Sequence, residues 1–138
     1  MDGNNRWSKN NNVSKYESYK KGANKLIEIT NFIFEKHKVN YVSAFALSKH
    51  NFKRGSKLIN IIKNIIQDFI TTSKKSNNLE FNIQFKGNLD FLPKKLTENI
   101  KIFESNNLKS SKKLIIYLNY SGKEDILLAS KKLFKLKK

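Results

Sequence analysis

Two short polar clusters in this chain combine residue types whose side chains can bind phosphate together. The first runs from Asp2 through Gly3 and Asn4 to Arg6, and Trp7 follows it. An aspartate can hold Mg2+, which takes one or two carboxylates and completes its coordination shell with substrate phosphates. Glycine lets a ligand approach the backbone, and the guanidinium fork of arginine binds two phosphate oxygens at once. The cluster has the parts of a metal-bound phosphate site, although taken alone it fits an exposed N-terminal tail with an Asp-Gly turn better.

The second cluster contains Ser48, Asn51 and Arg54 and follows a nearly continuous apolar stretch. Its hydroxyl, amide and guanidinium groups can converge on an anion, and a polar turn between a strand and a helix explains them equally well. Arg6 and Arg54 are the only arginines in a chain with 28 lysine and arginine residues. Because a lysine ammonium cannot form the bidentate fork, arginine at these two places indicates binding of phosphate or carboxylate.

The composition indicates one folded domain over residues 1–138. Hydrophobic residues make up 38% of the chain, which is enough for a core at this length. The absence of cysteine excludes disulfides and cysteine-ligated zinc, and it fits a reducing cytosol. No apolar run reaches the length of a membrane span and no signal-peptide pattern precedes the first cluster. We therefore expect a cytoplasmic protein, and the lysine-rich C-terminal stretch leaves a peripheral contact with a membrane open.

A formal net charge of +17 makes the protein attractive to anions. Such a field draws in nucleic acid, anionic lipid or polyphosphate ligands without distinguishing among them. The lysines are scattered, however, and they accompany many Asn and Ile residues, as coding in an A- and T-rich genome produces. A small basic nucleic-acid binder has only this charge in its favour, since no RNA-binding signature or recognition-helix pattern is found. We expect no nucleic-acid partner.

Hydrophobic periodicity predicts helices and strands in alternation. The expected helices are residues 19–36, 57–72, 94–105 and 124–136. The expected strands are residues 39–47 and 114–118, both buried on two faces, and residues 79–85, buried on one face. This order predicts an α/β fold with a mostly parallel sheet and flanking helices.

The loops that follow the strands of such a sheet meet at one edge, where ligands normally bind. Residues 48–54, 87–93 and 119–122 follow the three expected strands, so we expect the second cluster to lie at that edge. Residues 8–18, between the first cluster and the first expected helix, lack apolar periodicity and are expected to form a mobile loop.

Four motifs, in this order, resemble the cis-prenyltransferases, also called isoprenyl transferases or undecaprenyl diphosphate synthases. The family opens with M-D-G-N-G-R-W-A, which residues 1–7 match except at Asn5. Its later motifs are F-S-x-E-N-W-x-R-P, I-G-D-x-x-x-L-P and N-Y-G-G-R-x-E-I, which correspond to residues 47–55, 86–93 and 119–126. The resemblance covers nearly the whole chain and implies an incomplete cis-prenyltransferase-like fold.

The resemblance implies an isoprenyl transferase that condenses isopentenyl diphosphate with an allylic, farnesyl-type diphosphate and so extends a cis-polyprenyl diphosphate. By similarity, Asp2 would position Mg2+ and the allylic diphosphate as a catalytic and metal-binding residue. Gly3, Asn4 and Arg6 would cradle the phosphates of that substrate. Trp7 would line the substrate entrance.

The second cluster would serve the other substrate. By similarity, Asn51 would be catalytic and assist proton removal from the condensing isopentenyl unit, and Ser48 and Arg54 would bind phosphate oxygens. Phe52 occupies the position of the motif tryptophan and would also bind substrate. The growing chain would occupy a hydrophobic tunnel along the second long helix. The tunnel candidates there are Ile61, Ile62, Ile65 and Phe69, although ordinary core is the expected role for most of them.

The chain departs from the family pattern at several motif positions. Lys15 and Tyr19 replace an arginine and a histidine, His50 replaces the motif glutamate, and Asn88 replaces an aspartate. Lys15 keeps a charge but loses the bidentate fork, and Tyr19 loses the imidazole. The sequence does not assign a role to these replacements.

Two parts of the family pattern have no counterpart in residues 1–138. These are the strand that ends in H-V-A-x-x-M-D-G-N and a C-terminal portion with R-x-S-G-E-x-R-x-S-N-F and a metal-binding glutamate. The expectation is a domain truncated at both ends, which would form a homodimer when complete and has little or no activity as written. The alternative is a non-catalytic truncated relative or a partner subunit of a cis-prenyltransferase.

Overall fold

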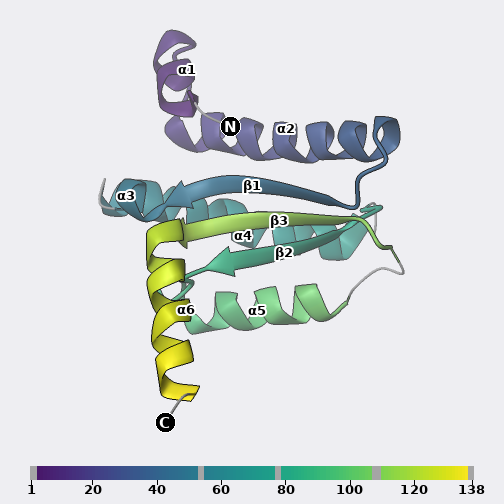
Figure 1. Cartoon of the computed structure of the whole chain (residues 1–138). Coiled ribbons are helices and arrows are strands. Elements are labelled where there is room, and N and C mark those ends of the chain that lie inside the picture. The colour runs from purple at the N-terminus through teal and green to yellow at the C-terminus, as the bar shows by residue number, and fades with distance from the viewer. Residues whose placement is uncertain (1–2, 53–54, 77–78, 107–109, 137–138) are drawn as a thin grey trace.

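The computed structural model of this chain describes residues 3–52, 55–76, 79–106 and 110–136. Within those ranges each strand is followed by one or two helices (Figure 1). The helices are α1 (Asn4–Asn10), α2 (Lys15–Lys36), α3 (Lys49–Phe52), α4 (Ser56–Ser76), α5 (Lys94–Ser105) and α6 (Gly122–Leu136). The strands are β1 (Tyr41–Ser48), β2 (Asn82–Gly87) and β3 (Lys113–Tyr120).

The three strands form one parallel sheet in the order β1-β3-β2. The central strand β3 aligns Lys113 with Tyr41 of β1 and with Asn82 of β2, so all three strands start at one edge and end at the other. The prediction of an α/β fold with a mostly parallel sheet is confirmed. The loops after the strands therefore leave the sheet at the same edge.

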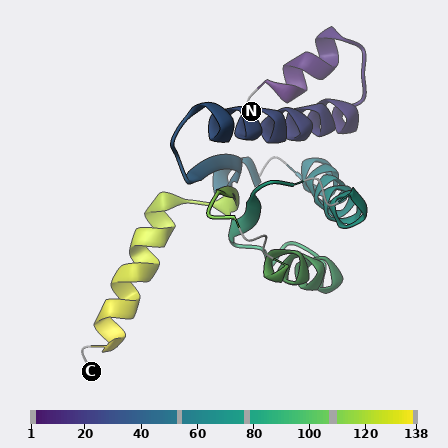
Figure 2. The ribbon, with the colours of Figure 1, turned by 90° about the vertical axis from the view of Figure 1, so that its right-hand side faces the viewer.

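The helices lie mainly to one side of the sheet. The end-on view shows α2, α4 and α5 arranged around it, while α6 extends away on the other side (Figure 2). α2 packs on α4, and α4 packs on α5. Together with β1–β3 these helices enclose one hydrophobic core. Its buried members are Phe34, Leu47, Ile62, Ile66, Ile70, Phe81, Ile83, Phe85, Leu92, Leu96, Ile100, Leu114 and Leu118.

The predicted loop over residues 8–18 is wrong, because most of that stretch is helical. α1 covers residues 4–10, and α2 begins at Lys15 instead of residue 19. A capping box starts α2: the Ser14 hydroxyl accepts the backbone N–H of Glu17 at 3.1 Å, and the Glu17 carboxylate accepts the backbone N–H of Ser14 at 3.0 Å. This Ser-x-x-Glu signal is visible in the sequence and marks a helix start before any apolar periodicity begins.

The predicted burial of β1 on both faces is also wrong. Tyr41 and Phe45 are 65% and 55% exposed, because among the described residues helices cover only one face of this strand. β3 fits its prediction on one face, where Leu114 and Leu118 are fully buried, whereas Ile115 and Tyr117 on the other face are half-buried. β2 begins three residues later than predicted, at Asn82.

β2 ends where its backbone comes very close to β3. Gly87 has φ +111, and a Cβ atom built there would lie 2.0 Å from the carbonyl oxygen of Leu118. Only glycine fits this conformation and this approach. The end of β2 is thereby held at the edge where the loops emerge.

Candidate functional site

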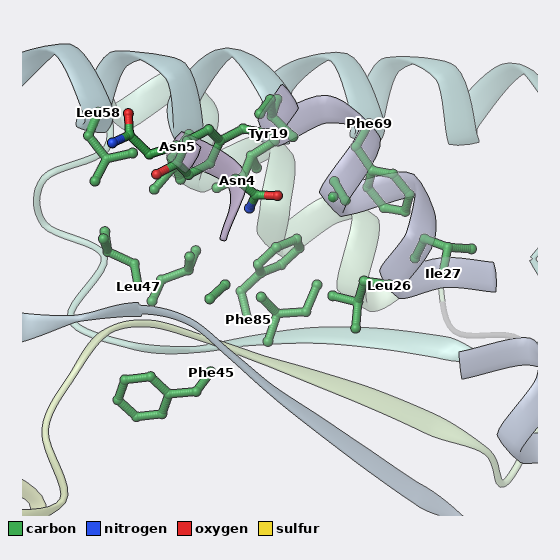
Figure 3. Close-up of a pocket in the computed structure, with 18 of the residues that line it drawn as sticks. Asn4, Asn5, Tyr19, Leu26, Ile27, Phe45, Leu47, Leu58, Phe69 and Phe85 are labelled. Atoms are coloured by element: carbon green, nitrogen blue, oxygen red, sulfur yellow. The ribbon is translucent and has the colours of Figure 1, made fainter. Parts of the chain in front are cut away.

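A cavity of about 430 Å3 lies between α2, α4 and the sheet, with the start of α1 at one end (Figure 3). This volume falls within the range of roughly 300–1,000 Å3 that small-molecule sites occupy. Its lining residues are Gly3, Asn4, Asn5, Arg6, Tyr19, Gly22, Ala23, Leu26, Ile27, Phe45, Ala46, Leu47, Leu58, Ile62, Ile65, Ile66, Phe69, Phe85, Ile116 and Leu118.

The cavity is polar at one end and apolar over the rest of its wall. The polar residues come from the turn into α1 and from the first turns of α2, and in Figure 3 Asn4, Asn5 and Tyr19 lie together. The apolar wall comes from α2, α4 and the covered face of the sheet, including Leu26 and Phe69. Such a division suits an amphiphilic ligand with an anionic head and a hydrocarbon tail.

The described residues of the first sequence cluster therefore belong to the cavity wall and do not form a free tail. Gly3, Asn4 and Arg6 line the cavity, as expected of substrate-binding residues. Trp7 is 37% exposed and is not among the lining residues; the ammonium of Lys21 lies 4.8 Å from its ring centroid. Asp2, the expected catalytic and metal residue, lies outside the described residues.

A hydrogen bond from a buried hydroxyl of α2 holds this turn against that helix, and two further bonds lie within the turn and α1. The backbone N–H of Trp7 donates to the Gly3 carbonyl at 2.8 Å, which starts α1. The Ser18 hydroxyl donates to the Asn4 carbonyl at 2.5 Å, and the Ser8 hydroxyl donates to the Asn5 carbonyl at 2.9 Å. Ser18 and Ser8 are 1% and 3% exposed, so these bonds are shielded from water.

The second cluster lies at the end of β1. Ser48 is the last residue of β1 and Phe52 closes α3, where its ring contacts that of Phe91 at a centroid distance of 5.2 Å. The backbone of Asn51 belongs to α3, but its side chain and all of Arg54 lie outside the described residues. Neither Ser48 nor Phe52 is among the described residues that line the cavity.

The motif over residues 119–126 meets the second cluster at this edge of the sheet. Lys49 forms an ion pair with Glu124, and Tyr120 donates a hydrogen bond to Asp125 at 3.1 Å. The bond to the Asp125 carboxylate raises the pKa of Tyr120. Close by, the side-chain oxygen of Asn119 is buried and has no hydrogen-bond donor among the described residues. The expected meeting of the loops after β1 and β3 is confirmed.

Tyr16 and Asp68 connect the two helices that wall the cavity. The Tyr16 hydroxyl of α2 hydrogen-bonds to the Asp68 carboxylate of α4, and this bond raises the pKa of Tyr16. Tyr19, one turn further along α2, and Phe69, next to Asp68, both line the cavity. The pair therefore joins the α2 and α4 walls beside the cavity.

The apolar wall contains three of the four tunnel candidates and adds residues to the site. Ile62, Ile65 and Phe69 line the cavity, whereas Ile61 is not a lining residue. Ile62 also belongs to the buried core and Phe69 packs against it, so the expected core role of most of these residues stays a prediction. The α2 side of the wall was missed. Its residues are Gly22, Ala23, Leu26 and Ile27. A glycine and an alanine inside a long helix, where no bulky side chain fills the space, were the available signal.

Two further features bear on ligands and membranes. Over the described residues, no three His, Cys, Asp or Glu side chains gather as a preformed metal site. Within the same ranges, no helix is both long enough and apolar enough to cross a membrane.

Comparisons with known proteins agree with the motifs. A family model described as putative undecaprenyl diphosphate synthase matches residues 1–138. Dehydrodolichyl diphosphate synthase 1 of Arabidopsis thaliana is 35% identical over 138 residues, which cover 98% of this chain and 45% of that protein. The isoprenyl transferase of Wolinella succinogenes is 27% identical over 136 residues, which cover 96% of this chain and 59% of that protein. The chain spans about half the length of these curated relatives.

A solved structure shares the fold. Lavandulyl diphosphate synthase from Lavandula x intermedia, crystallised in complex with dimethylallyl diphosphate, superposes with a TM-score of 0.82 at 23% sequence identity. The match covers 98% of this chain and 58% of that chain. The α/β fold implied by the motifs is therefore confirmed.

Proposed function

Since the chain belongs to the undecaprenyl diphosphate synthase family, we propose that it carries the allylic-diphosphate site of a cis-prenyltransferase. In that reaction, an allylic diphosphate is condensed with isopentenyl diphosphate and a cis-polyprenyl diphosphate is extended. The observation that carries the proposal is a cavity that is polar at the Gly3–Arg6 turn and apolar along α2 and α4.

The polar end binds the diphosphate. The Arg6 guanidinium holds two phosphate oxygens in a bidentate pair, and the Asn4 amide donates a further hydrogen bond. Gly3 has φ +90 and no atom within 4 Å of an added Cβ, so nothing here keeps a phosphate away from the backbone. Trp7, which directly follows this turn, would line the substrate entrance.

Mg2+ is the expected cofactor, and the donor set fits it. Asp2 immediately precedes Gly3 in the sequence, and magnesium normally takes one or two carboxylates together with substrate phosphate oxygens. The described residues contain no cluster of three metal ligands, which is compatible with a magnesium ion that takes only one or two carboxylates. When bound, the ion neutralises charge on the diphosphate as it becomes the leaving group.

The apolar wall binds the isoprenoid tail. Hydrocarbon released from water is stabilised by about 25 cal/mol for each Å2 buried. Ile62, Ile65 and Phe69 of α4 line the cavity together with Leu26 and Ile27 of α2. The tail therefore supplies affinity, while the polar turn fixes the position of the reacting carbon.

The second cluster binds isopentenyl diphosphate. Ser48 and Arg54 hold its phosphate oxygens, Phe52 packs against the substrate, and Asn51 assists removal of the proton lost on condensation. This assignment is supported by the place of α3 directly after β1, at the edge where the strands end.

Binding of farnesyl diphosphate tests the proposal directly. Trp7 is the only tryptophan of the chain and follows the polar turn, so its fluorescence should change on binding. Arg6→Ala should lower the affinity for farnesyl diphosphate about 10- to 100-fold, because hydrogen bonds to a charged group contribute about 1.5–3 kcal/mol. Farnesol, which lacks the diphosphate, should bind both proteins equally well.

Lys9→Ala is the matched control, because Lys9 is an exposed basic residue of α1 that does not line the cavity. It removes one charge from the general positive field, and the affinity for farnesyl diphosphate should stay within about twofold. Equal losses in Arg6→Ala and Lys9→Ala, or wild-type binding of inorganic pyrophosphate as tight as that of farnesyl diphosphate, would refute the proposed site.

Turnover is a separate measurement. The chain spans about half the length of its curated relatives, so we expect the 138 residues alone to incorporate little or no labelled isopentenyl diphosphate with farnesyl diphosphate and Mg2+. Binding without turnover would also fit the alternative, a non-catalytic relative or partner subunit. Robust turnover that Asp2→Ala abolishes would show that these residues suffice for catalysis.

A further inference from the structure

The polar turn is attached to the body of the protein mainly through one helix, because the main contacts of α1 are with α2. We propose that Gly22 and Ser18 of α2 are positioning residues that hold Asn4 at the polar end of the cavity for the allylic diphosphate. The inference deepens the proposed function and rests on it.

Gly22 provides the space in which the Asn4 amide lies. A Cβ atom at Gly22 would stand 2.7 Å from Oδ1, 3.0 Å from Nδ2 and 3.2 Å from Cγ of Asn4. All three contacts are with the same side-chain amide, and none is with the backbone. A methyl group at this position therefore displaces the amide without disturbing the helix.

Ser18 holds the backbone of the same residue. It lies one helical turn before Gly22, so the two occupy the same face of α2. Its hydroxyl donates to the Asn4 carbonyl at 2.5 Å, and the residue is 1% exposed. The carbonyl and the amide of Asn4 are thus both fixed against one stripe of α2.

No backbone requirement explains glycine at position 22. Gly22 lies inside α2, and among the described residues the glycines with positive φ are Gly3, Gly55 and Gly87. Glycine in a helix interior is less favourable than alanine, since it loses more conformational freedom on folding. Glycine at position 22 therefore lowers the stability of the helix. The contact that requires the absence of a side chain there is the one with Asn4.

Gly22→Ala separates stability from binding. The variant should melt about 4 °C higher than the wild type, because alanine favours the helix. By calorimetry it should bind farnesyl diphosphate about tenfold more weakly and farnesol equally well, because the head loses an oriented hydrogen bond while the tail does not. If Gly22 had a purely structural role, the substitution would leave the affinities for farnesyl diphosphate and farnesol unchanged or lower both by the same factor.

Two variants show whether the effect passes through Asn4. In an Asn4→Ala background, Gly22→Ala should cause no further loss of farnesyl diphosphate affinity, because the displaced amide is already absent. Ser18→Ala should weaken farnesyl diphosphate and spare farnesol. Asn24→Ala, an exposed replacement in the same helix, is the control and should raise the melting temperature without changing either affinity.

The outcomes distinguish this inference from the proposed function. If the wild-type chain binds farnesyl diphosphate no better than farnesol, the proposed function fails and the inference with it. Only the positioning role is overturned if the wild-type chain prefers the diphosphate and Gly22→Ala keeps that preference. The same holds if Gly22→Ala lowers the affinity for farnesyl diphosphate by the same factor in the Asn4→Ala background as in the wild type.

Discussion

The two faces of the parallel sheet are built from the same strands, yet they differ sharply in burial. On the covered face, Leu47, Leu114 and Leu118 are at most 1% exposed and lie against the helices and the cavity. On the open face, Tyr41 and Phe45 are 65% and 55% exposed. In Figure 3 the ring of Phe45 lies on the opposite side of β1 from Leu47.

An irregularity in β1 produces part of this difference. Side chains alternate between faces along a regular strand, so Phe45 and Leu47 should share a face. The pairing with β3 shifts register between Phe45 and Leu47, and again before Ser48. A bulge of this kind redirects side chains and is common near active sites. Here it turns Leu47 into the cavity wall and brings Ser48 to the sheet edge.

α6 continues the open side with apolar residues that pack on little of the described chain. Ile126 and Phe134 are 72% and 73% exposed, and Leu127 and Leu133 are about as accessible, at 60% and 61%. By contrast, the mostly polar α1 is held against α2 by the hydrogen bond from the buried Ser18 hydroxyl. Hydrophobicity therefore decides what a surface can pack against, whereas coverage by other elements decides whether it is buried.

The largest expected effect is on the covered face. Leu114→Ala should reduce the free energy of unfolding by about 3–4 kcal/mol, because it removes most of a fully buried side chain and leaves a cavity in its place. Tyr41→Ala, on the open face of the neighbouring strand, should change it by less than about 1 kcal/mol. Urea denaturation measures both, and similar losses would mean that the two faces are equally packed.

The next effect tests the close approach of β2 and β3. Gly87→Ala should cost about 3 kcal/mol of unfolding free energy, since it combines a positive φ with a clash against the Leu118 carbonyl. Gly122→Ala is the control, because an added Cβ there meets no atom within 4 Å. Thermal melts of the two variants should differ clearly, and a neutral Gly87→Ala would show that the strand ends separate easily.

The smallest expected effect is on the open side. Phe134→Lys should change the unfolding free energy by no more than about 0.5 kcal/mol, because the side chain is largely exposed. It should nevertheless reduce binding of the dye ANS and self-association, which exposed apolar groups promote. A large loss of stability would instead place Phe134 in a packed interface.

Most helices and strands could be predicted because their hydrophobic periodicity is strong. The predictions were wrong where a helix is stabilised by contacts other than an apolar stripe. α4 and α5 carry regular apolar stripes and were found within a few residues. α1 has no such stripe and was missed, since its contacts are with Ser18 and Lys21 of another helix. The Ser14–Glu17 capping box was readable and would have corrected the start of α2.

The candidate site, too, could be predicted from the sequence only in part. The family motifs, the alternation of helices and strands, and the cluster of Gly3, Asn4 and Arg6 can be read from the amino-acid sequence alone. The tertiary contacts alone show that α2 forms one side of the cavity wall, that Gly22 makes room for Asn4, and that one face of β1 stays open. These are contacts between residues far apart in the chain, and local periodicity reports the shape of one element but not what covers it.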